Sequence, residues 1–128
     1  MQSETLSNLH LGWIFGGWFV AVTVTAAVYV GGVGLGLASS DTSVVVWVVA
    51  SLAVGFFVGG LLVGMRWSNA PILHGAAITL FAVVVWFGLT LVGGPEHVDS
   101  PIVLGAILVQ LIASCSGGWT GKRLGQPR

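Results

Sequence analysis

Charged residues are scarce in this chain. Only 6% of its 128 residues are Asp, Glu, Lys or Arg, whereas about 25% is usual for a soluble domain. The formal net charge is zero, and the largest basic cluster is the pair Lys122-Arg123, which is too small to bind a nucleic acid backbone. The composition therefore argues against a soluble globular protein and against a nucleic acid partner.

Cysteine and catalytic motifs are equally scarce. The single cysteine, Cys115, can form neither an internal disulfide nor a thiolate metal site. It lies in an apolar segment, where a small packing role is expected. The sequence contains no HExxH motif, no paired carboxylates and no Ser-His arrangement, so it lacks the patterns that activate a nucleophile or a metal-bound water. We therefore expect a protein that is not an enzyme.

Apolar residues, in contrast, are abundant. They make up 55% of the chain, and the mean hydropathy is +1.00. Short polar segments divide them into four spans, residues 11–37, 44–65, 71–92 and 101–121. Each span is about 20 residues or longer, enough to cross a hydrocarbon core about 30 Å thick as a helix. The sequence predicts an all-α polytopic membrane protein in which residues 1–128 form a single domain of four transmembrane helices.

The basic residues predict the orientation of these helices. All four follow the second or the fourth span: Arg66, Lys122, Arg123 and Arg128. The positive-inside rule places this side in the cytoplasm, together with both termini. Three tryptophans also fall near this boundary, as an interfacial aromatic belt requires: Trp13, Trp67 and Trp119. We expect a multi-pass protein of a bacterial inner membrane, with Arg66, Lys122, Arg123 and these tryptophans as its interface anchors.

Twenty glycines, more than twice the average usage, are a further feature of the chain. In the second and fourth spans several are spaced four residues apart: Gly55 and Gly59, Gly60 and Gly64, Gly117 and Gly121. Such spacing places small residues on one helix face and lets two backbones approach closely. These glycines are therefore predicted helix-packing residues. The contacts could lie within the chain, or the glycines could form a docking face for another subunit.

The second and fourth spans also end alike. Residues 60–66 and 117–123 share the pattern GxxxGxR, at a separation of 57 residues. The matched ends predict two helical hairpins, spans one-two and three-four, in parallel orientation about an axis along the membrane normal.

The same segments carry a family resemblance. The end of the first hairpin, residues 59–66, and the start of the next helix, Pro71-Ile72-Leu73-His74-Gly75-Ala76, resemble a group of small bacterial four-helix membrane proteins of unknown function. The resemblance implies a fold and a topology. It implies no activity.

Polar groups at membrane depth are few. No Asp, Glu, Lys or Arg falls inside a predicted span, and Gln110 is the only strongly polar residue near the middle of one. Pumps and transporters place ionisable residues at this depth, so the sequence disfavours them. We expect Gln110 to be an interhelical clamp rather than a substrate ligand.

His74 is the one candidate cofactor ligand. It lies about one turn into the third span, beside Gly75 and Ala76. An imidazole next to small residues leaves room for a planar macrocycle and can ligate its metal. The ligand would be (bacterio)chlorophyll or another tetrapyrrole. The alternative is an interfacial histidine bonded to a neighbouring loop or to a lipid headgroup.

These features together predict a non-catalytic accessory or structural subunit. Its partners would be other membrane protein subunits, in an assembly of the photosynthetic or respiratory type, and lipids. Two alternatives remain open. One is a small-molecule or lipid transporter that works as a homodimer, and the other is a pigment-binding subunit that uses His74.

Overall fold

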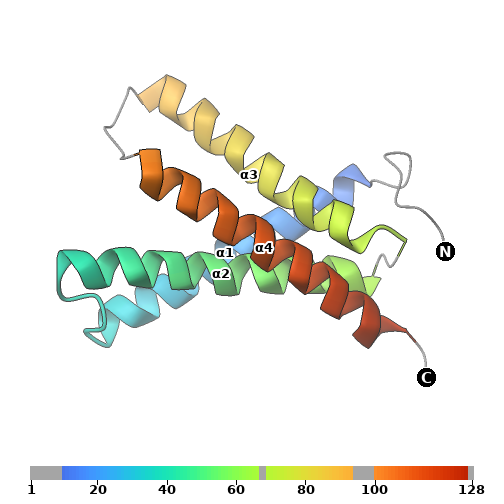
Figure 1. The fold of residues 1–128 in the computed structure, drawn as a ribbon, viewed down its shortest axis with the longest axis horizontal. Helices are drawn as coiled ribbons and strands as arrows, with labels where there is room; N and C mark the ends of the chain where they lie inside the picture. The colour runs from blue at the N-terminus through green and yellow to red at the C-terminus, as the bar shows by residue number, and fades with distance from the viewer. Residues whose placement is uncertain (1–9, 67–68, 94–99, 127–128) are drawn as a thin grey trace.

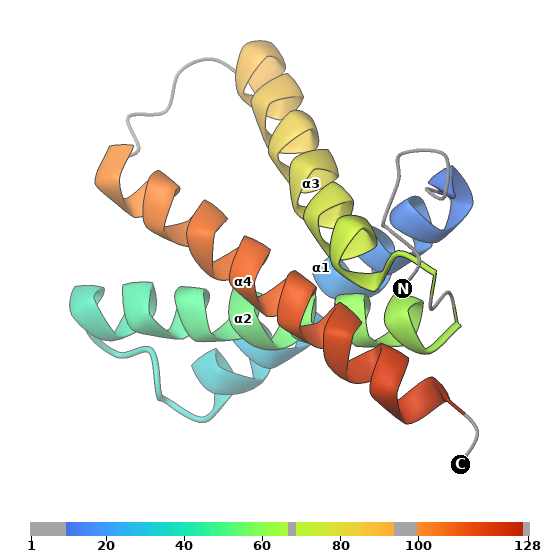
Figure 2. The same ribbon diagram turned by 45° about the vertical axis from the view of Figure 1, so that its right-hand side comes forward.

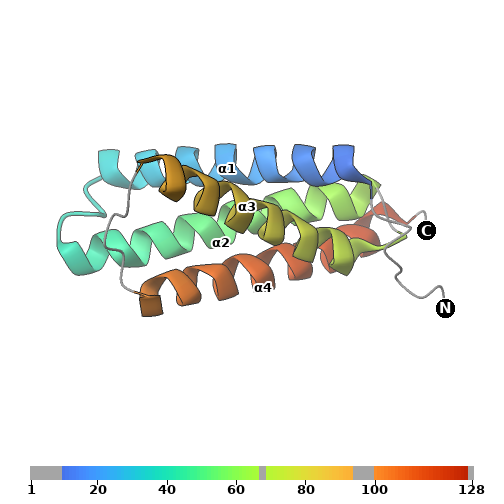
Figure 3. The ribbon, with the colours of Figure 1, turned by 90° about the horizontal axis from the view of Figure 1, so that it is seen from above.

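The computed structural model describes residues 10–66, 69–93 and 100–126. These residues form four helices: α1 (Leu11–Gly34), α2 (Asp41–Arg66), α3 (Pro71–Gly93) and α4 (Ser100–Gly125). The helices run back and forth, and all four are long and apolar enough to cross a membrane (Figures 1 and 3). The prediction of an all-α fold with four helices, each long and apolar enough to span a membrane, is confirmed.

The two ends of the helix bundle differ in charge. One end contains the starts of α1 and α3 and the ends of α2 and α4 (Figure 1). It carries the described basic residues, Arg66, Lys122 and Arg123, and is called the basic end below. At the other end, called the opposite end, Asp41 begins α2. Charged side chains among the described residues therefore lie only in the first or last turn of a helix.

Two helix boundaries differ from the predicted spans because of local capping. At the start of α2, the backbone N–H of Ser43 donates to Ser40 Oγ over 3.2 Å, and the N–H of Ser40 donates to Ser43 Oγ over 2.8 Å. This reciprocal capping lets α2 begin at Asp41 rather than at residue 44. At the end of α1, Gly36 adopts a φ of +75°.

The end of α1 has the geometry of a Schellman motif. The N–H of Leu37 donates to the carbonyl of Gly32 over 2.9 Å, and that of Gly36 donates to Val33 over 3.0 Å. These bonds satisfy carbonyls that the helix leaves unpaired. They require one residue in the left-handed conformation, which glycine adopts at no steric cost. The helix therefore ends at Gly34 rather than at residue 37.

Helix α2 is central in the bundle. It packs extensively on α4 and on α1, whereas α3 contacts α4 more than it contacts α1 or α2. The buried apolar core lies between the helices and is formed by Ile14, Ala21, Phe56, Val63, Ile78 and Ala113. Trp18 of α1 meets Phe81 of α3 edge to face, with ring centroids 5.1 Å apart. This aromatic contact holds the first and third helices together.

Helices α3 and α4 pack closely near the basic end and diverge toward the opposite end (Figure 2). Hydrogen bonds join the first half of α3 to the second half of α4, as in the bond from Ser114 to the carbonyl of Gly75. The divergence leaves space between these helices in the other half of the bundle.

Candidate functional site

Glycines mediate the contact between α2 and α4. A Cβ atom built on Gly60 of α2 would collide with the carbonyl oxygen of Ser114 in α4, and one built on Gly117 of α4 would collide with that of Phe57 in α2. Gly60 and Gly117 lie 57 residues apart, as do Phe57 and Ser114. Adding 57 to the α2 residue number of one contact and subtracting 57 from its α4 residue number therefore gives the other contact. The same separation of 57 residues relates the two GxxxGxR segments.

The next helical turn repeats this reciprocal relation. A Cβ on Gly64 would meet the carbonyl oxygen of Gly118, and a Cβ on Gly121 would meet that of Leu61. These pairs also exchange under the shift of 57 residues. Since a side chain on either helix would strike the backbone of the other, only glycine permits this approach.

The remaining predicted glycines face α1. A Cβ on Gly55 would collide with Thr25 Oγ1 and the carbonyl oxygen of Ala21, and a Cβ on Gly59 would lie 2.5 Å from the carbonyl oxygen of Gly17. The structure thus places all six predicted helix-packing glycines in contacts within the chain. A docking surface for another subunit would have to use other residues.

His74 is fully buried at the start of α3. Its Nδ1 lies 2.7 Å from the carbonyl oxygen of Ala70, and its Nε2 accepts a hydrogen bond from the backbone N–H of His10 over 3.2 Å. A carbonyl oxygen can only accept, so Nδ1 carries the proton and Nε2 supplies its lone pair to His10. In this arrangement neither ring nitrogen is free to ligate a metal. The geometry favours the structural interpretation of His74 over the tetrapyrrole interpretation.

Ser114 is the centre of a buried polar cluster between α3 and α4. Its hydroxyl is fully buried, donates to the carbonyl of Gly75 over 2.8 Å and lies 2.9 Å from the hydroxyl of Thr79. The sequence did not distinguish Ser114 from the other hydroxyls of the spans. Several of those bond only to their own helix, as Ser116 does to the carbonyl of Ile112.

The described residues among the predicted interface anchors lie near the ends of their helices, and their anchoring role stays a prediction. Arg66 ends α2, and Lys122 and Arg123 occupy the last turn of α4. The guanidinium of Arg123 stacks over the ring of Trp119 at 3.7 Å from its centroid. Trp13, near the start of α1, is half-buried and packs against the core. Trp67 and Arg128 lie outside the described residues.

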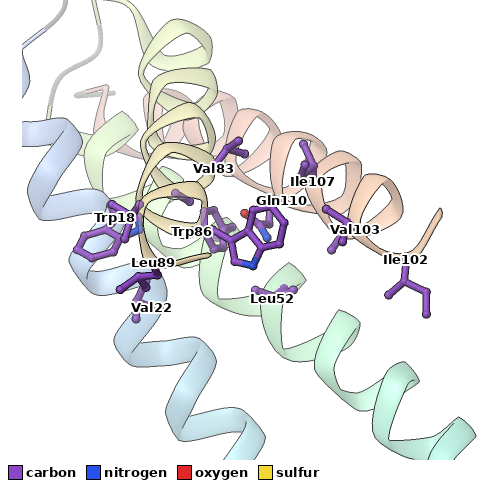
Figure 4. A pocket seen from close by; sticks show the side chains of 14 residues that line it. Trp18, Val22, Leu52, Val83, Trp86, Leu89, Ile102, Val103, Ile107 and Gln110 are labelled. Carbon is purple, nitrogen blue, oxygen red and sulfur yellow. The ribbon is translucent and has the colours of Figure 1, made fainter. Parts of the chain in front are cut away.

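A cavity of about 440 Å³ occupies the space where α3 and α4 diverge (Figure 4). All four helices contribute to its wall, with Val22 of α1, Leu52 of α2, Trp86 of α3 and Ile107 of α4 among the lining residues. The wall is apolar apart from the amide of Gln110 and the indole nitrogens of tryptophan. We refer to this cavity as the α3–α4 cleft.

Gln110 does not act as the predicted clamp. It lines the α3–α4 cleft and is partly exposed there. Within the described part of the chain its side chain makes no hydrogen bond to a neighbouring helix. The cleft was not predicted from the sequence. The one sequence feature that could have indicated it is the isolated amide of Gln110 in the middle of an apolar span.

Comparison of this chain with protein-family models, with curated proteins and with solved structures gives no match. The resemblance to small bacterial four-helix membrane proteins therefore stays a prediction.

Proposed function

We propose that this chain is a non-catalytic transmembrane subunit of a larger membrane protein assembly, of the photosynthetic or respiratory type. The observation that carries the proposal is that its buried polar groups form hydrogen bonds within and between the helices. Among the residues that the structure describes, the fully or almost fully buried polar side chains are Ser51, His74, Thr79 and Ser114. Each of them is engaged in a hydrogen bond that holds a helix to itself or to its neighbour. Such groups contribute to a stable scaffold rather than to a reaction.

The distribution of charge supports a definite orientation for the subunit. The described basic residues share one end of the bundle, and the positive-inside rule assigns such an end to the cytoplasm. Both termini are then cytoplasmic, and the protein resides in a bacterial inner membrane. The guanidinium of Arg123, stacked on Trp119, is suited to the interface, where it can meet lipid phosphates.

The reciprocal contacts of α2 with α4 support the hairpin repeat. When a two-fold axis relates two similar helices, each contact between them occurs twice, with the roles of the two helices exchanged. The paired glycine contacts of α2 and α4 follow this pattern. In this proposal the hairpins α1–α2 and α3–α4 are parallel repeats about an axis along the membrane normal.

Purification of the tagged protein from its native membrane in mild detergent tests the proposal. We expect it to migrate with other membrane proteins in a complex of fixed composition, identified by mass spectrometry. A control with the same tag on an unrelated four-helix membrane protein defines the background. Recovery of the chain alone, from membranes in which it is abundant, would contradict the subunit role.

A transporter built from two hairpin repeats is the second candidate, because the α3–α4 cleft reaches residues of all four helices. Flux of a lipid or small molecule into liposomes that contain only this chain would favour it. The tetrapyrrole alternative has no comparable support, since both ring nitrogens of His74 are occupied.

A further inference from the structure

The α3–α4 cleft has one polar group at an informative depth. Gln110 lies ten residues after Ser100, the first residue of α4, and at about 1.5 Å per residue it is roughly 15 Å along the helix. A hydrocarbon core is about 30 Å thick, so a membrane-spanning α4 holds this amide near the midplane. The other residues of α4 that line the cleft, from Ile102 to Ile107, lie between Gln110 and the opposite end.

The amide of Gln110 needs a hydrogen-bonding partner at that depth. It has two donors and one acceptor, and water to satisfy them is scarce in the middle of a bilayer. No described helix supplies a bond to it. Gln110 and Trp86 both line the cleft, together with aliphatic side chains of all four helices (Figure 4). An occupant of the cleft that brings a carbonyl or hydroxyl oxygen to Gln110 would remove an unsatisfied group.

The size of the cleft limits what the occupant can be. Its volume of about 440 Å³ falls within the range of about 300–1,000 Å³ typical of sites for small molecules. A small membrane-soluble molecule is therefore of the right size for this space.

A phospholipid fits the polar group poorly. Its ester carbonyls stay in the interfacial region outside the hydrocarbon core. An acyl chain that entered from the opposite end would place only methylene and methyl groups against Gln110. The matching molecule is one that dissolves wholly in the membrane and has an oxygen at midplane depth.

We propose that the α3–α4 cleft binds a membrane-soluble molecule with a flat apolar ring that bears a carbonyl oxygen, the chemical class of the isoprenoid quinones. The amide of Gln110 donates to the carbonyl, Trp86 packs on the ring, and the aliphatic wall covers its substituents. This site does not rest on the subunit role, because it is complete in a single chain.

Binding of decylubiquinone to the purified chain in lipid nanodiscs tests the site. Tryptophan fluorescence quenching is followed against the mole ratio of quinone to lipid, and the saturable part is taken as binding. Gln110→Leu should weaken saturable binding about three- to tenfold, the range for loss of one buried hydrogen bond. Ile112→Leu, on the same helix and largely exposed to lipid, is the matched control and should bind like the wild type.

Two further comparisons make the test decisive. Decylbenzene keeps a ring and a tail without a carbonyl, so it should compete weakly, and equally so in wild type and Gln110→Leu. Ala106→Phe, at the cleft wall, should abolish saturable binding; if that variant does not fold, Ala106→Val should reduce it. Binding of decylbenzene to the wild type as strongly as decylubiquinone, or no effect of Gln110→Leu on quinone binding, would overturn the quinone assignment and leave an acyl-chain groove. Quenching that never saturates would overturn the site itself, as would a dimer whose cross-links run through the cleft.

Discussion

The backbone N–H of His10, the residue before α1, donates a hydrogen bond to Nε2 of His74, one turn into α3. The same imidazole is held at Nδ1 by the carbonyl of Ala70, over 2.7 Å. One side chain thus joins the starts of two helices that run in the same direction, and fixes their relative height at the basic end. It also satisfies a backbone donor that the first turn of α1 leaves without a partner in its own helix.

His74→Leu should lower the free energy of unfolding by about 1–3 kcal/mol, since it removes the hydrogen bonds of the imidazole to the N–H of His10 and to the carbonyl of Ala70, at about 0.5–1.5 kcal/mol each. Unfolding in mixed micelles with increasing SDS measures the loss. Thr90→Val on the same helix, where the hydroxyl bonds only to the carbonyl of Trp86, should stay within about 0.5 kcal/mol of wild type. A tetrapyrrole absorption band that disappears in His74→Leu would contradict the structural role.

Gly60→Ala and Gly117→Ala should each destabilise the protein by about 1–3 kcal/mol, because the new methyl group meets a carbonyl oxygen of the facing helix. Their effects should be similar, since the two positions are related by the shift of 57 residues. The control is Gly105→Ala on α4, where a Cβ meets nothing within 4 Å, and that variant should be neutral or stabilised by about 0.5–1 kcal/mol.

Replacement of Gly60 or Gly117 by leucine should block correct folding of the chain, and association with any partner would fail as a consequence. Leu61→Ile keeps an apolar side chain and should fold normally. Measurement of monodispersity and of SDS resistance for the isolated variants separates the two effects. A leucine variant that folds like wild type but loses a partner would show that the glycine face serves another subunit.

Ser114→Ala should cost about 0.6–1.7 kcal/mol, the range found for hydrogen bonds between membrane helices. Ser116→Ala, two residues away, removes a hydroxyl that bonds within its own helix and should cost less. A double-mutant cycle of Ser114→Ala with Thr79→Val isolates the contact between the two hydroxyls, which lie 2.9 Å apart. Additive losses would show that this contact contributes no coupling energy.

Orientation can be tested with single cysteines in a Cys115→Ala background. A cysteine at Ser40, between α1 and α2, should react with a membrane-impermeant maleimide added to intact cells. A cysteine at either terminus should react only after the membrane is opened. Neutralising Arg66 or Arg123 to Gln should increase the fraction of misoriented chains more than it changes stability. Labelling of the C-terminus in intact cells would refute the orientation.

The four spans were predictable because each needs only length and apolar composition. Their ends were less so, since local bonds set them. The left-handed Gly36 ends α1 early, and the Ser40–Ser43 capping starts α2 early. In each case the hydropathy of the flanking residues gave no sign of the helix boundary.

The glycine positions were predicted, but their partners were not. Spacing of four residues indicates that a face approaches something closely, whether a helix of the same chain or of another. The reciprocal contacts of Gly60 with Ser114 and of Gly117 with Phe57 depend on how α2 and α4 cross. The α3–α4 cleft depends on the divergence of two helices, and no periodicity in the sequence indicates that divergence. Gln110 was therefore predicted to be an interhelical clamp rather than a residue in the wall of a cleft.

The reciprocal contact of α2 with α4 has a consequence for synthesis in the membrane. During insertion, α2 enters the bilayer well before α4, because α3 and its connections lie between them in the chain. Until α4 arrives, α2 exposes to lipid a glycine face whose natural complement is a copy of the same pattern. Two nascent chains at this stage can pair through α2 in place of the later α4, as transiently open surfaces do in other misassemblies. Prompt arrival of α4 therefore protects each chain from its neighbours.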